Sequence, residues 1–112
     1  AMGDSITFGR NDQGELKSSY IQMTLANLNN SIYLNPTIAI NGNTTTQVIS
    51  EQLPKITNLY DGSRNNNICS IMIGINDIRT GGDENTIKNN ITKYDKNAYE
   101  KVNRSTKVFT CF

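Results

Sequence analysis

Histidine is absent from this chain of 112 residues. Its absence removes the side chain that most often acts as a general base in enzymes and that most often binds metal ions, and no other cluster of metal ligands stands out. Only two cysteines are present, Cys69 and Cys111, each within an apolar run and without a CxxC-type partner. Two free thiols are therefore expected, and a disulfide framework is not indicated.

An excess of charge of one sign and long apolar runs are also lacking. Eleven Lys and Arg residues are mixed with ten Asp and Glu residues, which gives a net charge of +1. Without a basic block, nucleic acid and anionic membrane surfaces are not expected as partners. No run approaches the roughly 20 apolar residues that a transmembrane helix needs. No glycine loop of the GxxxxGK[ST] or GxGxxG type is present for phosphate binding.

Short apolar runs alternate along the chain with segments in which apolar residues recur every three or four positions. The first pattern predicts buried strands and the second predicts helices. A strand is expected to end at Ser5, with most of it upstream, and further strands at 37–40, 68–73 and 107–112. Helices are expected at 18–29, 45–59 and 84–103. Ser18 or Ser19 is expected to cap the first helix, and Pro54 to kink or break the second.

This alternation of strands and helices predicts an α/β fold, in which crossover helices cover the faces of a parallel sheet. Three polar turns follow three of the strands: Gly3-Asp4-Ser5, Asn41-Gly42-Asn43 and Gly74-Ile75-Asn76-Asp77. Right-handed crossovers place these turns at one edge of the sheet, and open sheets of this kind bind ligands at the carboxyl ends of their strands. The sequence therefore predicts a site at this edge.

The residue types in the three turns fit ester hydrolysis. A serine that attacks an ester needs a proton acceptor and donors that stabilise the oxyanion. Ser5 is the candidate nucleophile, and its own N–H, the N–H of Gly42 and the side-chain amide of Asn76 are the candidate donors. Each residue also has a structural interpretation: Ser5 as a turn or capping serine, Gly42 as a glycine with positive φ, and Asn76 as a helix cap.

The three turns resemble the sequence blocks of the SGNH, or GDSL, hydrolase superfamily. Gly3-Asp4-Ser5-Ile6-Thr7-Phe8-Gly9 is similar to the first block, with Ile6 in place of leucine. Gly42, followed by Asn43-Thr44-Thr45-Thr46, is similar to the second block, and Gly74-Ile75-Asn76-Asp77 to the third, a GxND pattern. The resemblance covers nearly the whole chain.

The resemblance implies a three-layer α/β/α sandwich with a flavodoxin-like parallel sheet, seen here incomplete. It implies that Ser5 is the nucleophile of an acyl-enzyme mechanism and that Gly42 and Asn76 help to form the oxyanion hole. Neither a metal nor an organic cofactor is implied. Asp4 and Asp77 are expected to support the turns by accepting backbone N–H bonds, and neither is expected to be the aspartate of the triad.

The fourth block of the superfamily, a DxxH pattern that carries the catalytic aspartate and histidine, is absent. Residues 1–112 are therefore interpreted as a partial esterase domain with a truncated first strand and without its C-terminal part. Two alternatives stay open: a degenerate protein that binds ligands without turnover, and a chain completed by a histidine from a partner. In every case the chain alone is expected to be inactive or very weak as a hydrolase.

The expected substrate is a small-molecule ester, either an acylated carbohydrate or a lipid. The stretch from Arg10 to Tyr20 is polar, which favours a small acyl group on a sugar. Arg10 and Arg79 stand near the predicted edge, either as solvated surface residues or in contact with an acidic group of the substrate. The sequence indicates neither the compartment nor the oligomeric state.

Overall fold

The computed structural model describes residues 1–11, 13–28, 37–64, 67–101 and 106–111. Its strands form one parallel sheet in the order β1-β2-β3, made of β1 (Met2–Gly3), β2 (Asn67–Met72) and β3 (Thr106–Cys111). Met2 pairs with Ile71, and Asn67 pairs with Thr106. The predicted parallel sheet is confirmed.

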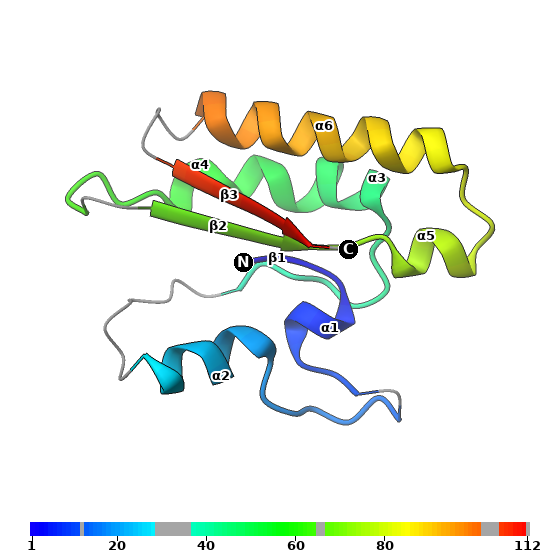
Figure 1. Cartoon of the computed structure of the whole chain (residues 1–112), viewed down its shortest axis with the longest axis horizontal. Helices are drawn as coiled ribbons and strands as arrows, with labels where there is room; N and C mark the ends of the chain where they lie inside the picture. Colours follow the sequence, from blue (N-terminus) through cyan, green and yellow to red (C-terminus); the bar gives the residue numbers. More distant parts are fainter. Residues whose placement is uncertain (12, 29–36, 65–66, 102–105, 112) are drawn as a thin grey trace.

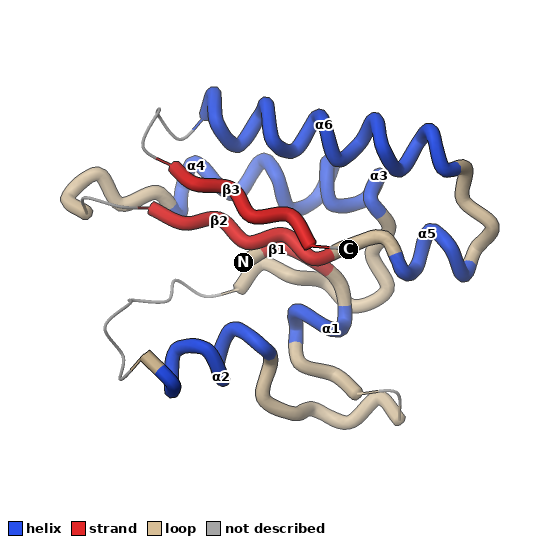
Figure 2. The backbone as a smooth tube through the Cα atoms, in the orientation of Figure 1, coloured by secondary structure: helices blue, strands red, loops and turns tan. Residues whose placement is uncertain are grey.

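Helices lie on both sides of this sheet (Figures 1 and 2). One side carries α1 (Ser5–Phe8) and α2 (Tyr20–Asn27), and the other carries α3 (Thr45–Gln47), α4 (Ile56–Leu59) and α6 (Glu84–Lys101). The short helix α5 (Ile75–Arg79) follows β2 at the end of the sheet. The predicted α/β architecture, with a helical layer on each face of a parallel sheet, is therefore confirmed.

The prediction of a strand at 37–40 is wrong, because the segment forms no regular strand, although it runs beside β1. The N–H of Ile38 donates to the carbonyl of Ala1, and the N–H of Ile40 donates to the carbonyl of Gly3, both at 3.1 Å. Because β1 contains only two residues, the ladder along this edge stays too short to form a strand. The hydrogen bonds nevertheless hold the turn after Ile40 next to the turn after Gly3.

The predicted helix at 45–59 follows one helical path whose backbone changes type three times, from α to π, from π to 3₁₀ and back to α. A π-helical turn, η1 (Val48–Gln52), follows α3, and a 3₁₀ turn, η2 (Leu53–Lys55), leads into α4. Pro54 has no N–H to donate to the helical ladder, which accounts for the break at η2. The expected disturbance at Pro54 is thus a 3₁₀ turn within a continuous helical path, and the π turn was not expected.

The other predicted elements differ from the structure mainly at their ends. The first helix begins at Tyr20, and Ser19 caps it through a capping box with Gln22. Strand β2 begins one residue earlier than expected, at Asn67, and ends at Met72. Residues 29, 102, 103 and 112, which belonged to predicted elements, lie outside the described residues. The short helices α1 and α5 were not expected, because four or five residues show no helical periodicity.

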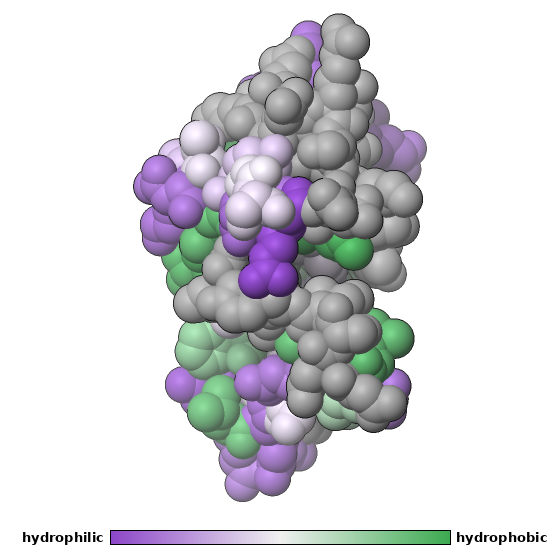
Figure 3. Space-filling model, turned by 90° about the vertical axis from the view of Figure 1, so that its left-hand side faces the viewer, coloured by the Kyte–Doolittle hydropathy of each residue, from purple (hydrophilic) through white to green (hydrophobic). Residues whose placement is uncertain are grey.

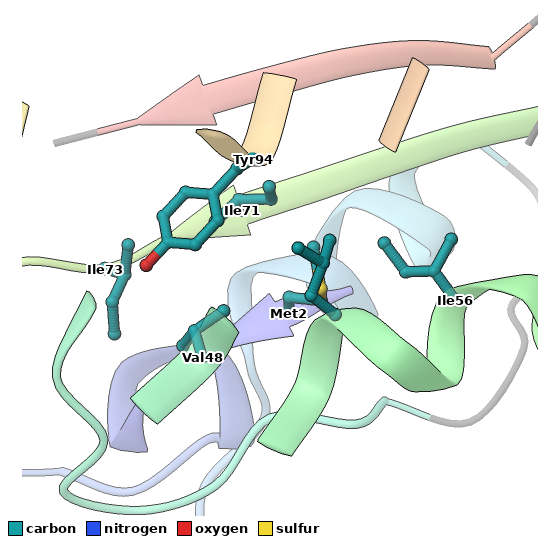
Figure 4. Close-up of a cluster of buried hydrophobic side chains, with 7 residues drawn as sticks. Met2, Val48, Ile56, Ile71, Ile73 and Tyr94 are labelled. Carbon is teal, nitrogen blue, oxygen red and sulfur yellow. The ribbon is translucent and has the colours of Figure 1, made fainter. Parts of the chain in front are cut away.

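The hydrophobic core lies between the sheet and the layer that contains α3, α4 and α6 (Figure 4). Its buried side chains come from β1, from the helical path after Thr45, from β2 and the residue after it, and from α6: Met2, Val48, Leu53, Ile56, Ile71, Ile73 and Tyr94. Burial of apolar side chains on this scale is the main source of stability for the fold.

The surface also presents large apolar side chains, among them Met23, Leu28 and Ile68, each more than 40% exposed. The face shown in Figure 3 has separate apolar patches between polar ones. Among the residues that the structure describes, no helix is both long and apolar enough to cross a membrane.

Candidate active site

The first turn places Ser5 at the start of α1, directly after β1. Asp4 caps this helix, because its Oδ1 accepts a hydrogen bond of 2.9 Å from the N–H of Ile6. Ser5 is the first residue of the helix and is half-buried. The capping role therefore belongs to Asp4 and not to Ser5. Ser5 follows the carboxyl end of a strand, but that strand ends at Gly3 and not, as the sequence predicted, at Ser5.

The second turn exposes the N–H of Gly42. Gly42 has φ +76°, a conformation that favours glycine, and the N–H of Asn43 closes the turn by donating to the carbonyl of Ile40 at 3.3 Å. Within the described part of the chain, neither the N–H of Gly42 nor that of Ser5 donates a hydrogen bond. Both groups are therefore available to an incoming acceptor.

The third turn brings the side-chain amide of Asn76 to the other two. Asn76 Nδ2 donates to the carbonyl of Asn43 at 2.9 Å and contacts Oδ2 of Asp4 at 3.4 Å. Asn43 follows Gly42 in the chain, and Asp4 precedes Ser5. One amide therefore joins the neighbours of both predicted residues, and no side-chain cap is formed at the start of α5. The structure thus brings Ser5, Gly42 and Asn76 to one edge of the sheet.

Asp77 connects the third turn to the start of α3. Its carboxylate accepts two hydrogen bonds from the N–H of Thr45, at 2.9 and 3.1 Å, and one of 2.5 Å from the Thr45 hydroxyl. Asn90 of α6 donates to the same hydroxyl oxygen at 3.0 Å. The buried Tyr94 hydroxyl donates to the carbonyl of Thr45. Burial, and then the charge of Asp77, raises the pKa of Tyr94, so that its hydroxyl stays a donor.

Gln52 is a completely buried polar residue that the sequence did not reveal. Its Oε1 accepts from the N–H of Gly3 at 2.9 Å, and its Nε2 donates to the carbonyl of Gly3 at 2.7 Å and to Oδ1 of Asn43 at 3.0 Å. The one available signal was position, since Gln52 stands four residues from both Val48 and Ile56 on an otherwise apolar helical face. Thr45 and Asn90 gave no comparable signal.

The surroundings of Asp4 disfavour its charged form. Its side chain is fully buried. Burial raises the pKa of the Asp4 carboxyl above its ordinary value, the hydrogen bond from Ile6 acts in the opposite direction, and the charge of Asp77 raises it further. The candidate site thus holds a carboxyl group beside Ser5 that binds its proton more tightly in the folded protein than in the unfolded chain.

The raised pKa of Asp4 predicts a pH dependence of stability. Between the ordinary pKa and the raised one, the folded state binds more protons, so that the free energy of unfolding falls as pH rises. Asp4→Asn removes this contribution. We expect the stability of wild type minus that of Asp4→Asn to decrease as pH rises above about 4, the ordinary pKa of an aspartate, measured by urea unfolding.

The carboxyls of Asp61 and Asp83 affect the pH dependence of stability in the opposite sense to Asp4, because their contribution to the free energy of unfolding increases as pH rises. Hydrogen bonds from Ser63 and Thr86, respectively, lower their pKa values. Because both proteins in the comparison retain these residues, their contributions cancel in the difference. A difference that stays constant or increases with pH would contradict the interpretation of Asp4.

The two arginines near the site do not form part of the three turns. Arg10 is exposed, its Nη1 donates to the carbonyl of Gly14 at 2.5 Å, and its guanidinium lies 5.7 Å from the ring centre of Phe8. Arg79 is exposed in the last turn of α5. Over the described ranges, no three His, Cys, Asp or Glu side chains gather as a metal site would require.

An open hollow adjoins α1, the helix that begins at Ser5. Its volume is about 460 Å³, and its lining residues are Phe8, Leu16, Lys17, Ser18 and Gln22. Phe8 is three residues after Ser5 on α1, so that the hollow begins within one helical turn of the candidate nucleophile. The lining combines an aromatic ring with hydroxyl, amide and ammonium groups.

Comparisons with known proteins agree with this arrangement. The sequence model of the GDSL-like lipase/acylhydrolase family matches residues 1–111. A protein from Parabacteroides merdae, solved by crystallography and named a GDSL-like lipase, superposes with a TM-score of 0.61 at 25% sequence identity. The match covers 98% of this chain and 56% of that protein, and no curated protein matches the sequence. The chain therefore belongs to the GDSL-like lipase/acylhydrolase family.

Proposed function

We propose that this chain carries the nucleophile and the oxyanion hole of a serine ester hydrolase. The observation that supports the proposal most is the position of the Asn76 amide, which contacts the residue before Ser5 and the residue after Gly42. Three turns far apart in sequence are thereby held together at the carboxyl ends of the strands, where parallel α/β sheets bind ligands.

In this proposal, Ser5 Oγ attacks the acyl carbonyl of an ester. The oxyanion that develops accepts hydrogen bonds from the N–H groups of Ser5 and Gly42 and from Asn76 Nδ2. The contact of 3.4 Å between Asn76 and Asp4 is long for a hydrogen bond. One amide hydrogen can therefore turn to the oxyanion while the bond of 2.9 Å to the Asn43 carbonyl holds the side chain.

Histidine is the side chain that most often takes the proton of such a serine, and the sequence has none. We propose a histidine elsewhere in a longer protein or on a partner chain. This base would protonate the leaving alcohol as the acyl-enzyme forms, and it would then activate the water that releases the acid. The hollow beside α1 would hold the polar alcohol part of the substrate.

Imidazole in solution can replace the absent base, which gives a test on the chain as it stands. We expect the wild-type chain to hydrolyse p-nitrophenyl acetate faster than imidazole alone does, with a rate that rises with imidazole concentration. Ser5→Ala should return the rate to that of imidazole alone. Ser50→Ala, which removes an exposed hydroxyl outside the three turns, is the matched control and should behave as wild type.

Equal rates for wild type and Ser5→Ala would reject Ser5 as the nucleophile and would favour ligand binding without turnover. The gene gives an independent test. A reading frame that continues past codon 112 into an Asp-x-x-His sequence would support a longer esterase. A stop codon in a verified transcript would instead support a binding protein or a histidine from a partner.

A further inference from the structure

Gln52 links the strand end that carries Ser5 to the turn that carries Gly42. Its side chain is 0% exposed and makes three hydrogen bonds: two with the backbone of Gly3, at 2.9 and 2.7 Å, and one of 3.0 Å with Oδ1 of Asn43. Gly3 is two residues before the candidate nucleophile, and Asn43 is directly after the glycine of the second turn. One planar amide therefore spans both turns.

The donors and acceptors around Gln52 allow only one orientation of its side-chain amide. Asn43 Nδ2 donates to Oε2 of Glu51 at 3.0 Å, so that Oδ1 of Asn43 must face Gln52. Gln52 Nε2 uses its two hydrogens on Asn43 and on the carbonyl of Gly3, and its Oε1 accepts from the N–H of Gly3. Each buried polar atom of the Gln52 side chain has a partner. A fully satisfied buried network fixes a single arrangement of the groups that it joins.

The backbone under Gln52 is unusual as well. Gln52 ends the π-helical turn η1, the segment of the helical path in which the α ladder is interrupted. Single π turns inside helices occur frequently at functional sites. The side chain bonds to Gly3 of β1 and to Asn43, and to neither Ser5 nor Gly42.

We propose that Gln52 is a positioning residue for the reaction of Ser5, a role that rests on the function proposed above. Through Gly3 it fixes where Ser5 begins α1, and through Asn43 it fixes where the N–H of Gly42 points. The oxyanion hole works only if its donors lie about 3 Å from the developing charge. Gln52 therefore sets the rate of the covalent step without contacting the substrate.

Asn43→Ala tests this role because it breaks only one part of the link. It removes the acceptor for Gln52 Nε2 but leaves both bonds between Gln52 and Gly3. It also leaves the Asn43 backbone carbonyl, which Asn76 requires. The readout is the reaction of Ser5 with a fluorophosphonate in imidazole, followed by intact mass. In that reaction the Ser5 Oγ–P bond forms, the P–F bond breaks, fluoride leaves and imidazole takes the serine proton.

We expect Asn43→Ala to lower the limiting labelling rate by about tenfold or more, because small displacements of aligned groups cost rate. The probe concentration that gives half of the limiting rate should change little. A general loss of folded protein would not lower the limiting rate while leaving this concentration unchanged. Asn43→Asp combined with Glu51→Gln should restore the rate, since this pair keeps an oxygen facing Gln52 and a hydrogen bond to residue 51. Ser50→Ala, in the π-helical turn η1 that also holds Gln52, is the control.

Gln52→Glu supplies a second variant if Asn43→Ala fails to fold. It keeps the acceptor for the N–H of Gly3 but places an oxygen opposite both the Gly3 carbonyl and Oδ1 of Asn43, so it too should label slowly. If a folded Asn43→Ala or Gln52→Glu variant labels as fast as wild type, the role of Gln52 is overturned and the proposed function is not. The same holds if the pair Asn43→Asp and Glu51→Gln labels as slowly as Asn43→Ala. A wild-type chain that is not labelled at Ser5 would overturn the proposed function, and the role of Gln52 with it.

Discussion

Replacing Gly3 with alanine is expected to lower the free energy of unfolding by about 4 kcal/mol, the sum of a strained backbone and an overpacked site. Gly3 has φ +153°, which L side chains rarely adopt. A Cβ at this position would lie closer than 3.0 Å to Oγ1 and Cβ of Thr7 and to the carbonyl oxygen of Met72. The Met72 carbonyl belongs to β2, so it cannot move without disturbing the sheet.

Gly81→Ala is the matched control for this prediction. Gly81 also has a positive φ, +75°, but a Cβ there would meet no atom within 4 Å. It should therefore cost about 1 kcal/mol, which is the backbone term alone. Urea unfolding of the two variants and wild type measures both effects. Equal losses for Gly3→Ala and Gly81→Ala would show that β1 can move away from Thr7 and Met72 enough to accept a methyl group.

The parts of the fold that the sequence predicted are those with a repeating pattern. The apolar run of β2 and the three-and-four spacing of α6 extend over enough residues to identify each element. Segment 37–40 has the same composition as a strand, but strand formation depends on a long neighbour, and β1 offers two residues. The π turn at Val48–Gln52 depends on how the helix packs on the sheet, and no local pattern reports that.

The site was predictable to the level of its three turns, because topology alone places the ends of parallel strands at one edge. The hydrogen bonds of Asn76 and Asp77 to residues more than 30 positions away depend on the loop conformations, which a single sequence does not define. Gln52 was missed for a different reason. A glutamine among apolar residues is normally solvated, and its burial here is explained by the N–H of Gly3 and the side chain of Asn43, to which it bonds.

Gln52→Leu is the second change with a large expected effect. Leucine has a similar size and fills the same space, so that a cavity does not form. It leaves the N–H of Gly3 and Oδ1 of Asn43 buried without partners, whereas the Gly3 carbonyl keeps its bond of 3.1 Å from the N–H of Ile40. Each buried group that loses its partner costs about 1–3 kcal/mol. We therefore expect a loss of about 4 kcal/mol in the free energy of unfolding.

Gln13→Leu makes the same chemical change at an exposed position and should alter stability by less than about 0.5 kcal/mol. Unfolding of both variants in urea, with wild type alongside, separates the effect of burial from that of composition. If Gln52→Leu were as stable as wild type, water or a shifted turn would have to satisfy Gly3 and Asn43 in its place. The hydrogen bonds of Gln52 would then be replaceable, and the two turns would hold their positions through Asn76 and Asp77 alone.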